Sequence, residues 1–234
     1  MDNDVYRCGG SLIHPSVVLT AAHCVIEKKA YSVRAGEWDS SSTSEILKKQ
    51  DRTVSSIKIH QDYISEIYYN DIALLFLSSP FTLAAHINVA CLPPLNTVVY
   101  SDNCYVTGWG KTSFGKEGNY PSILKEVRLP MIPTDTCEEN LQKTRLGIYF
   151  QLHSSFVCAG GEKGKDACIG DGGGPLVCHI DGKDERYQQV GIVSWGIGCG
   201  DEDVPGVYTN VAFLREWIDQ QMKNNNFDVS MYRY

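Results

Sequence analysis

The chain lacks any run of apolar residues long enough to cross a membrane, since a spanning helix needs roughly 18 of them. It also lacks an excess of positive charge, because its 21 lysines and arginines are outnumbered by 28 aspartates and glutamates, which leaves a net charge of -7. The basic residues form no long block that would bind a phosphate backbone. We therefore expect neither a membrane nor a nucleic acid as a partner.

Paired Cys-x-x-Cys ligand sets are missing too, although the chain holds nine cysteines. Many cysteines without this spacing indicate disulfide bonds and an oxidising compartment rather than zinc. The connectivity stays open at this point, because eight cysteines can pair in about a hundred ways. The odd number leaves one cysteine free or bonded to something else.

Short apolar segments separated by clusters of Gly, Pro, Asn and Ser make up most of the sequence. Such a pattern predicts short strands in a sandwich or barrel. The length of 234 residues fits one large domain or two small ones. Strands are expected at 11–19, 31–35, 72–77, 105–108 and 189–195.

One helix is predicted from pattern alone over residues 211–222. Apolar residues recur there at helical spacing, at Phe213, Leu214, Trp217, Ile218 and Met222. The aromatic-rich segment 227–234 after it is expected to be a mobile terminus, with an adhesive tail for a partner as the alternative.

Two motifs carry residues suited to acid and base chemistry. Thr20-Ala21-Ala22-His23-Cys24 follows an apolar run, and Asp71 opens the segment Asp71-Ile72-Ala73-Leu74-Leu75. Taken singly, such a histidine is usually structural, and such an aspartate is usually a turn or cap residue. Further motifs are Cys8-Gly9-Gly10-Ser11-Leu12-Ile13, Gly108-Trp109-Gly110, Gly170-Asp171-Gly172-Gly173-Gly174-Pro175, Ser194-Trp195-Gly196 and Pro205-Gly206-Val207-Tyr208.

Together these motifs resemble those of the chymotrypsin/trypsin-like serine proteases over essentially the whole chain. The resemblance implies an all-β fold of two six-stranded antiparallel β-barrels, with the active-site cleft between them, and a C-terminal α-helix. The implied divisions are residues 1–97 for the N-terminal barrel, whose first strand is missing from the chain, 98–210 for the C-terminal barrel, 211–223 for the helix and 224–234 for the tail.

By this resemblance His23 is the general base and Asp71 is the carboxylate that orients it. The family's attacking serine falls at Gly172, which has no side chain. Without a hydroxyl there can be no acyl-enzyme. We therefore interpret the chain as a pseudoprotease in which His23 and Asp71 are remnants and no catalytic residue is active.

The resemblance also implies a vestigial specificity pocket with Asp166 at its base, where a carboxylate selects arginine or lysine. Its walls are Ser194, Gly196 and Gly206. The backbone N–H groups of Gly170 and Gly172 are the expected remnant of an oxyanion hole. We expect an inherited pocket without present use, rather than a site for the basic side chain of a partner.

Asp171 resembles the buried aspartate that pairs with the new amino terminus of an activated family member. Only seven residues precede Cys8, so the chain resembles a fragment, or one of two chains left after a cut. A buried carboxylate without a cation is costly and would be protonated, moved or paired elsewhere.

The resemblance supplies the disulfide pairing that the spacing leaves open. The implied pairs are Cys8 with Cys24, Cys104 with Cys178, Cys137 with Cys158, and Cys168 with Cys199. Cys91 is left over, and its place before Leu92-Pro93-Pro94 implies a bond to an upstream segment. The loop 36–50, with Glu37, Asp39 and Glu45, resembles a calcium-binding loop of some family members. We otherwise expect no cofactor and no metal.

Several details resemble the clip-domain serine protease homologues of arthropod haemolymph: Gly172 itself, segment 33–39 and Cys91-Leu92-Pro93-Pro94. The resemblance implies a secreted, non-catalytic cofactor or adaptor in prophenoloxidase activation, which serves melanisation and innate immunity. Its expected partners are a prophenoloxidase, its activating protease, or both, and an upstream clip-domain segment held through Cys91. Two alternatives are a trypsin-like endopeptidase inactivated by an engineered serine-to-glycine change, and a secreted pattern-binding or antimicrobial protein.

Overall fold

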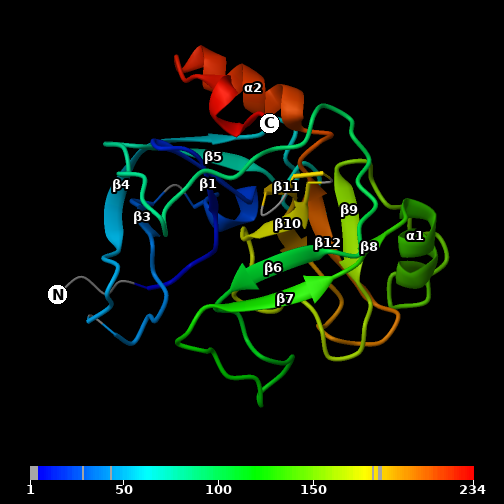
Figure 1. Cartoon of the computed structure of the whole chain (residues 1–234). Helices are drawn as coiled ribbons and strands as arrows, with labels where there is room; N and C mark the ends of the chain where they lie inside the picture. Colours follow the sequence, from blue (N-terminus) through cyan, green and yellow to red (C-terminus); the bar gives the residue numbers. More distant parts are fainter. Residues whose placement is uncertain (1–4, 28, 43, 181, 184–185) are drawn as a thin grey trace.

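Two antiparallel β-sheets form the body of the chain, and α2 (Arg215–Asn224) and α1 (Thr134–Gln142) lie on its outside (Figure 1). This computed structural model describes residues 5–27, 29–42, 44–180, 182–183 and 186–234. Among these residues, no helix has the length and hydrophobicity to cross a membrane.

The first sheet has the strand order β1-β2-β5-β4-β3. Its strands are β1 (Ser11–His14), β2 (Val17–Thr20), β3 (Ser32–Ala35), β4 (Gln50–Ile59) and β5 (Ala73–Leu77). The central strands β2 and β5 are buried along their whole length, so they read as continuous apolar runs. The single strand predicted over 11–19 is wrong. It is a hairpin instead, because Pro15 and Ser16 form a turn where proline has no N–H to donate.

The second sheet has the strand order β7-β6-β10-β11-β12-β9-β8. Its strands are β6 (Cys104–Gly108), β7 (Lys125–Leu129), β8 (Met131–Ile132), β9 (Phe156–Gly160), β10 (Pro175–His179), β11 (Tyr187–Trp195) and β12 (Pro205–Asn210). β7 and β8 occupy opposite edges, yet only Pro130 separates them in the chain. The sheet must therefore curl until its edges approach each other.

The predicted all-β fold of two curled antiparallel sheets with a C-terminal helix is confirmed. The described residues give five strands in the first sheet and seven in the second, where six were expected in each. β7 and β8 are two parts of one bent segment, which accounts for the higher count in the second sheet.

The C-terminal helix begins later than predicted, because residues 211–214 form a turn before α2 starts at Arg215. Its buried residues Trp217, Ile218 and Met222 pack into the core of the first sheet. The short helix α1 was not predicted, since only Cys137 and Leu141 of its nine residues are buried.

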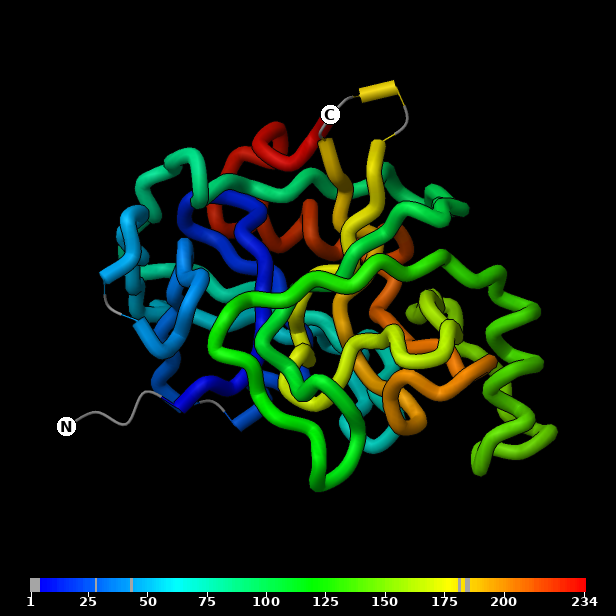
Figure 2. The backbone as a smooth tube through the Cα atoms, turned by 60° about the horizontal axis from the view of Figure 1, so that its bottom comes forward, coloured from blue at the N-terminus to red at the C-terminus, as the bar shows by residue number. Residues whose placement is uncertain are grey.

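The expectation of a mobile terminus is wrong, because the last residues pack against the body. Tyr232 is fully buried, and its hydroxyl donates to Asp219 Oδ1 over 2.8 Å. Phe227 stacks on Phe76 with the ring centroids 5.4 Å apart. The chain then ends beside the hairpin between β10 and β11, where Tyr234 lies near Lys183 (Figure 2). Aromatic residues with satisfied hydroxyls hold this terminus in place.

Candidate functional site

His23 and Asp71 meet because their segments flank neighbouring strands. His23 lies in a 3-10 turn (Ala22–Cys24) directly after β2, Asp71 lies just before β5, and these two strands pair in the first sheet. His23 Nδ1 donates to Asp71 Oδ2 over 2.7 Å, and the His23 backbone N–H donates to Asp71 Oδ1 over 2.9 Å. The imidazole is thus held in one orientation with Nε2 as its free nitrogen.

Asp71 is completely buried and is held by both sheets. Ser194 of β11 donates its hydroxyl to Asp71 Oδ2 over 2.6 Å, and Thr209 of β12 donates to the Asp71 carbonyl over 2.8 Å. The side chain of Ser194 therefore supports this carboxylate, whereas it was expected as a wall of the specificity pocket.

Gly172 lies directly in front of the histidine. A Cβ atom added at Gly172 would come within 2.9 Å of His23 Nε2 and 3.9 Å of Cys8 Sγ. With no side chain there, Nε2 has Cys24 Sγ at 3.5 Å as a neighbour instead. The pair can hold a proton, but residue 172 offers it no hydroxyl to activate.

Asp171 is 9% exposed and accepts two backbone hydrogen bonds. Its Oδ1 accepts from Gly110 N–H over 2.8 Å, and its Oδ2 accepts from Cys168 N–H over 2.9 Å. No ion pair reaches it from the part of the chain that the structure describes. Burial raises the pKa of this carboxyl group, and the two N–H donors oppose that rise.

The neighbouring Gly170 has a φ of 105°, which favours glycine. Its carbonyl accepts a hydrogen bond of 3.0 Å from the Tyr6 hydroxyl. Burial and then the charge of Asp171 raise the pKa of Tyr6 to about 12, so this phenol keeps its proton as a donor. No sequence motif pointed to Tyr6, because its contact spans 164 residues of the chain.

Asp166 lies close to Gly206, where an added Cβ would meet Asp166 Oδ1 at 2.9 Å. Asp166 Oδ2 accepts from Gly200 N–H over 3.1 Å, while Oδ1 is buried without a hydrogen-bond partner among the described residues. The nearby Tyr208 hydroxyl is likewise buried without one. An added Cβ at Gly196 would come within 3.3 Å of Gly198 O, so this position has little room for a side chain. Burial is the main cause that raises the pKa of Asp166 to about 6.

The four predicted disulfides are confirmed. They join Cys8 to Cys24, Cys104 to Cys178, Cys137 to Cys158 and Cys168 to Cys199. Cys91 is the free, partly buried cysteine. The sulfurs of Cys8 and Cys24 lie within 4.8 Å of His23, but their bond to each other removes them as metal ligands.

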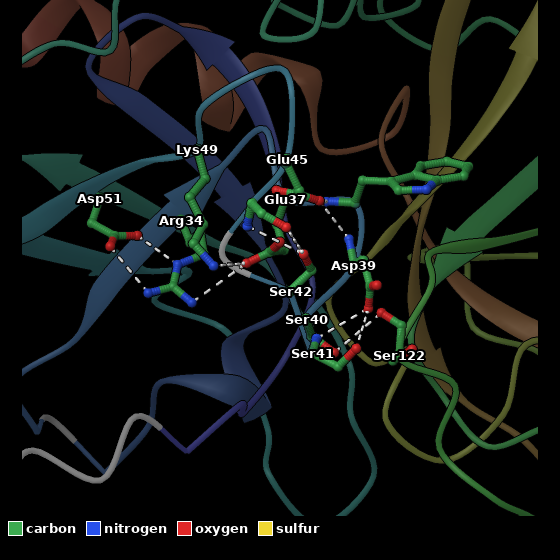
Figure 3. A network of polar contacts seen from close by, with 12 residues as sticks. Arg34, Glu37, Asp39, Ser40, Ser41, Ser42, Glu45, Lys49, Asp51 and Ser122 are labelled. Carbon is green, nitrogen blue, oxygen red and sulfur yellow. Dashed lines mark hydrogen bonds and ion pairs between the residues drawn. The ribbon is translucent and has the colours of Figure 1, made fainter.

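The loop after Glu37 carries its own cations (Figure 3). Lys49 Nζ lies 2.6 Å from Glu37 Oε2, and the Arg34 guanidinium approaches the same oxygen at 3.5 Å. Glu45 Oε1 accepts the backbone N–H groups of Trp38 and Asp39. Calcium is bound by about six to eight oxygen ligands, and an ammonium group cannot be one of them. The residues present therefore do not fit a calcium ion at Glu37.

Comparison with known proteins places this geometry in a family. The sequence pattern described as Trypsin matches residues 2–218. The chain belongs to the trypsin family. Within this family it is 53% identical over 232 residues to phenoloxidase-activating factor 2 of Galleria mellonella. The aligned region covers 99% of this chain and 77% of that protein.

Two further relatives carry the word inactive in their names. Inactive CLIP domain-containing serine protease A3 of Aedes aegypti is 47% identical over 222 residues, or 92% of this chain and 46% of that protein. Inactive CLIP domain-containing serine protease A28 of Anopheles gambiae is 40% identical over 230 residues, or 97% of this chain and 60% of that protein. This trypsin-family chain thus spans less than two thirds of the length of both inactive relatives.

Proposed function

We propose that this chain is a pseudoprotease that acts as a non-catalytic cofactor in the secreted protease cascade that activates prophenoloxidase in haemolymph. The observation that carries the proposal is Gly172, the residue in front of His23 Nε2, which has no hydroxyl. An oriented His–Asp pair without a nucleophile cannot form an acyl-enzyme. The names of the relatives, a phenoloxidase-activating factor and inactive CLIP proteases, support the same function.

Residual hydrolysis would not provide a useful activity. In a related triad, removal of the serine lowers turnover by about 10^6, and what remains over water comes from binding and the oxyanion hole. The role of the chain is therefore to bind a prophenoloxidase, its activating protease, or both.

Cys91 is proposed to bond an upstream clip-domain segment. It is partly exposed beside Gln188, and an Arg186 guanidinium nitrogen is 3.5 Å from its sulfur. Non-reducing peptide mapping of the natural full-length protein should recover Cys91 in a cross-linked peptide. Recovery of Cys91 only as a free thiol would remove this part of the proposal.

The main test adds the purified natural protein to prophenoloxidase with and without its activating protease. We expect phenoloxidase activity to rise only when the protease and this protein are both present. The matched control is the same protein with its disulfides reduced and alkylated, which should have no effect. Unchanged phenoloxidase output with the native protein would contradict the cofactor function.

A second measurement tests the loss of the nucleophile separately. A fluorophosphonate probe should leave the protein unlabelled, while it labels the activating protease in the same mixture. A covalent adduct on a residue of the cleft would show that a nucleophile is present and would overturn the pseudoprotease assignment.

A further inference from the structure

A cavity of about 620 Å³ lies at the junction of the two sheets, and none of its lining residues belongs to the site around His23. It is lined by the segment after β4, Asn70 before β5, the segment before β9 and the first turns of α2. Its main polar and aromatic residues are His60, Asp62, His153, Glu216, Trp217 and Gln220. Small-molecule sites commonly have volumes of about 300 to 1,000 Å³ and lie between structural units.

The two histidines of this cavity have the same tautomer, because each makes the same local hydrogen bond to a backbone N–H group. His60 Nδ1 accepts the backbone N–H of Asp62 over 3.2 Å, and His153 Nδ1 accepts the backbone N–H of Ser155 over 3.2 Å. Because each Nδ1 is an acceptor, each neutral ring carries its proton on Nε2. Burial lowers the pKa of His60, which favours its neutral form.

Aromatic contacts hold both imidazoles in place. The His153 ring stacks on Tyr69 with the centroids 4.0 Å apart, and the His60 ring lies 5.1 Å from that of the buried Trp217. Both imidazole rings are thus held in place before any ligand arrives, which reduces the entropy cost of binding.

The donors and acceptors of the cavity discriminate between classes of ligand. A metal ion would need the lone pair of Nε2, which the proton occupies in this tautomer. A phosphate or sulfate would need a cation, and among the described residues no lysine or arginine lines the cavity. A lysine or arginine side chain of a partner could bind the carboxylates of Asp62 and Glu216, but it only donates and could not use the two Nε2–H groups.

Sugar hydroxyl groups both donate and accept, so they match this mixture of imidazole N–H groups, carboxylates and amides. Aromatic surfaces such as that of Phe213, which is 40% exposed at the cavity, suit the apolar faces of sugar rings. We propose that this cavity binds a short neutral oligosaccharide. The proposal does not depend on the cofactor function, because it uses none of the residues around Gly172.

The test measures binding of laminarihexaose and chitohexaose, which are neutral sugars of two kinds, to the folded chain by titration calorimetry. We expect saturable binding of at least one of them. His153→Phe keeps a ring against Tyr69 and removes the Nε2–H donor, and Glu216→Ala removes an exposed acceptor. Each change should weaken binding about tenfold or more, which corresponds to the loss of one good hydrogen bond.

Lys223→Ala is the matched control, since Lys223 is exposed on α2 and does not line the cavity. It should leave the sugar affinity unchanged. If His153→Phe does not fold, as judged by circular dichroism, the exposed Gln220→Ala replaces it. No saturable binding of either sugar, or equal affinity in all variants, would overturn the proposal. Tighter binding of an arginine-rich peptide that is lost in Glu216→Ala would overturn it in favour of a cationic ligand.

Discussion

The His23–Asp71 half of the site and the Gly170–Gly172 half differ in how completely their polar groups are satisfied. Asp71 accepts three hydrogen bonds at its carboxylate, from His23 and from Ser194. Asp171 in the other half is also buried, yet it accepts only two backbone N–H groups and has no ion pair with the described residues. The first half stabilises the fold whether or not catalysis occurs, whereas the buried carboxylate of the second half has no side-chain partner among the described residues.

This difference separates the side chains that the fold needs from those that it does not. A side chain that joins two sheets, as Asp71 does through Ser194 and Thr209, is needed for stability. A hydroxyl at Gly172 would project toward His23 Nε2 and join no other elements. Removal of the Asp71 side chain should therefore cost stability, whereas the absence of a hydroxyl at residue 172 should not.

The largest expected effect comes from removing the Asp71 carboxylate, which lies in the half of the site whose hydrogen bonds are satisfied. Asp71→Ala leaves the buried donors of His23 and Ser194 without an acceptor, and we expect the free energy of unfolding to fall by about 3 to 5 kcal/mol. Urea denaturation followed by tryptophan fluorescence measures this change. Glu202→Ala, at an exposed carboxylate, should stay within about 0.5 kcal/mol of the parent chain. A loss of similar size in both variants would show that the hydrogen bonds of Asp71 do not stabilise the fold.

The second effect comes from neutralising Asp166, a buried carboxylate near the Gly170–Gly172 half of the site whose charge is not compensated. The pKa of Asp166 is raised to about 6, above its unfolded value of 3.8, so the folded state holds this proton where the unfolded state loses it. The free energy of unfolding therefore falls as the pH rises from about 4 to 6, and the penalty is complete above that range. Asp166→Asn should remove a penalty of about 2 to 3 kcal/mol near pH 7.5 and have little effect near pH 4.

Denaturation curves at the two pH values measure this difference. Asp201→Asn, at an exposed neighbouring carboxylate, is the control and should change stability little at either pH. Equal stability of Asp166→Asn and the parent chain at both pH values would show that the carboxylate is compensated in solution.

The third effect comes from adding a side chain at Gly172. Gly172 does not have a positive φ, so a serine fits its backbone, but the added Cβ would lie 2.9 Å from His23 Nε2. We expect Gly172→Ser to lower the free energy of unfolding by about 1 kcal/mol through this crowding. It should show no cleavage of arginine chromogenic substrates beyond that of Gly172→Ala, which adds the same Cβ without a hydroxyl. Cleavage by the serine variant alone would show that the second half still works.

The parts of this site that the sequence predicted are those that lie in local motifs. His23, Asp71 and Gly172 each fall in a short segment whose residue types identify it, and the pairing of all eight bonded cysteines followed from the resemblance. The spacing of turns and apolar strands indicated a sandwich or barrel, and the resemblance narrowed this to two barrels. Each motif that carried these predictions is made of a few residues that are close together in the chain.

The parts that were missed depend on contacts between distant segments. The tail was expected to be mobile because its partners, such as Asp219 for Tyr232, become visible only after α2 packs on the first sheet. Similarly, His60 and His153 lie far apart in the chain and share a cavity only because the two sheets meet there. The hydroxyl of Ser194 turns toward Asp71, which its motif alone did not reveal.

The smallest expected effect concerns the loop after Glu37, which belongs to the same sheet as His23 and Asp71. There Lys49 and Arg34 supply positive charge at Oε2 of the buried Glu37 carboxylate, while its Oε1 has no hydrogen-bond partner among the described residues. We expect calcium and EDTA to give the same melting temperature, because a bound ion would stabilise the chain only if it bound the folded state. Lys49→Glu is the informative variant, because it replaces the ammonium group by a further carboxylate. If calcium raises the melting temperature of Lys49→Glu alone, the lysine takes the place of a metal ion in the parent chain. If calcium raises the melting temperature of the parent chain, the charge of Glu37 is not fully balanced by Lys49 and Arg34.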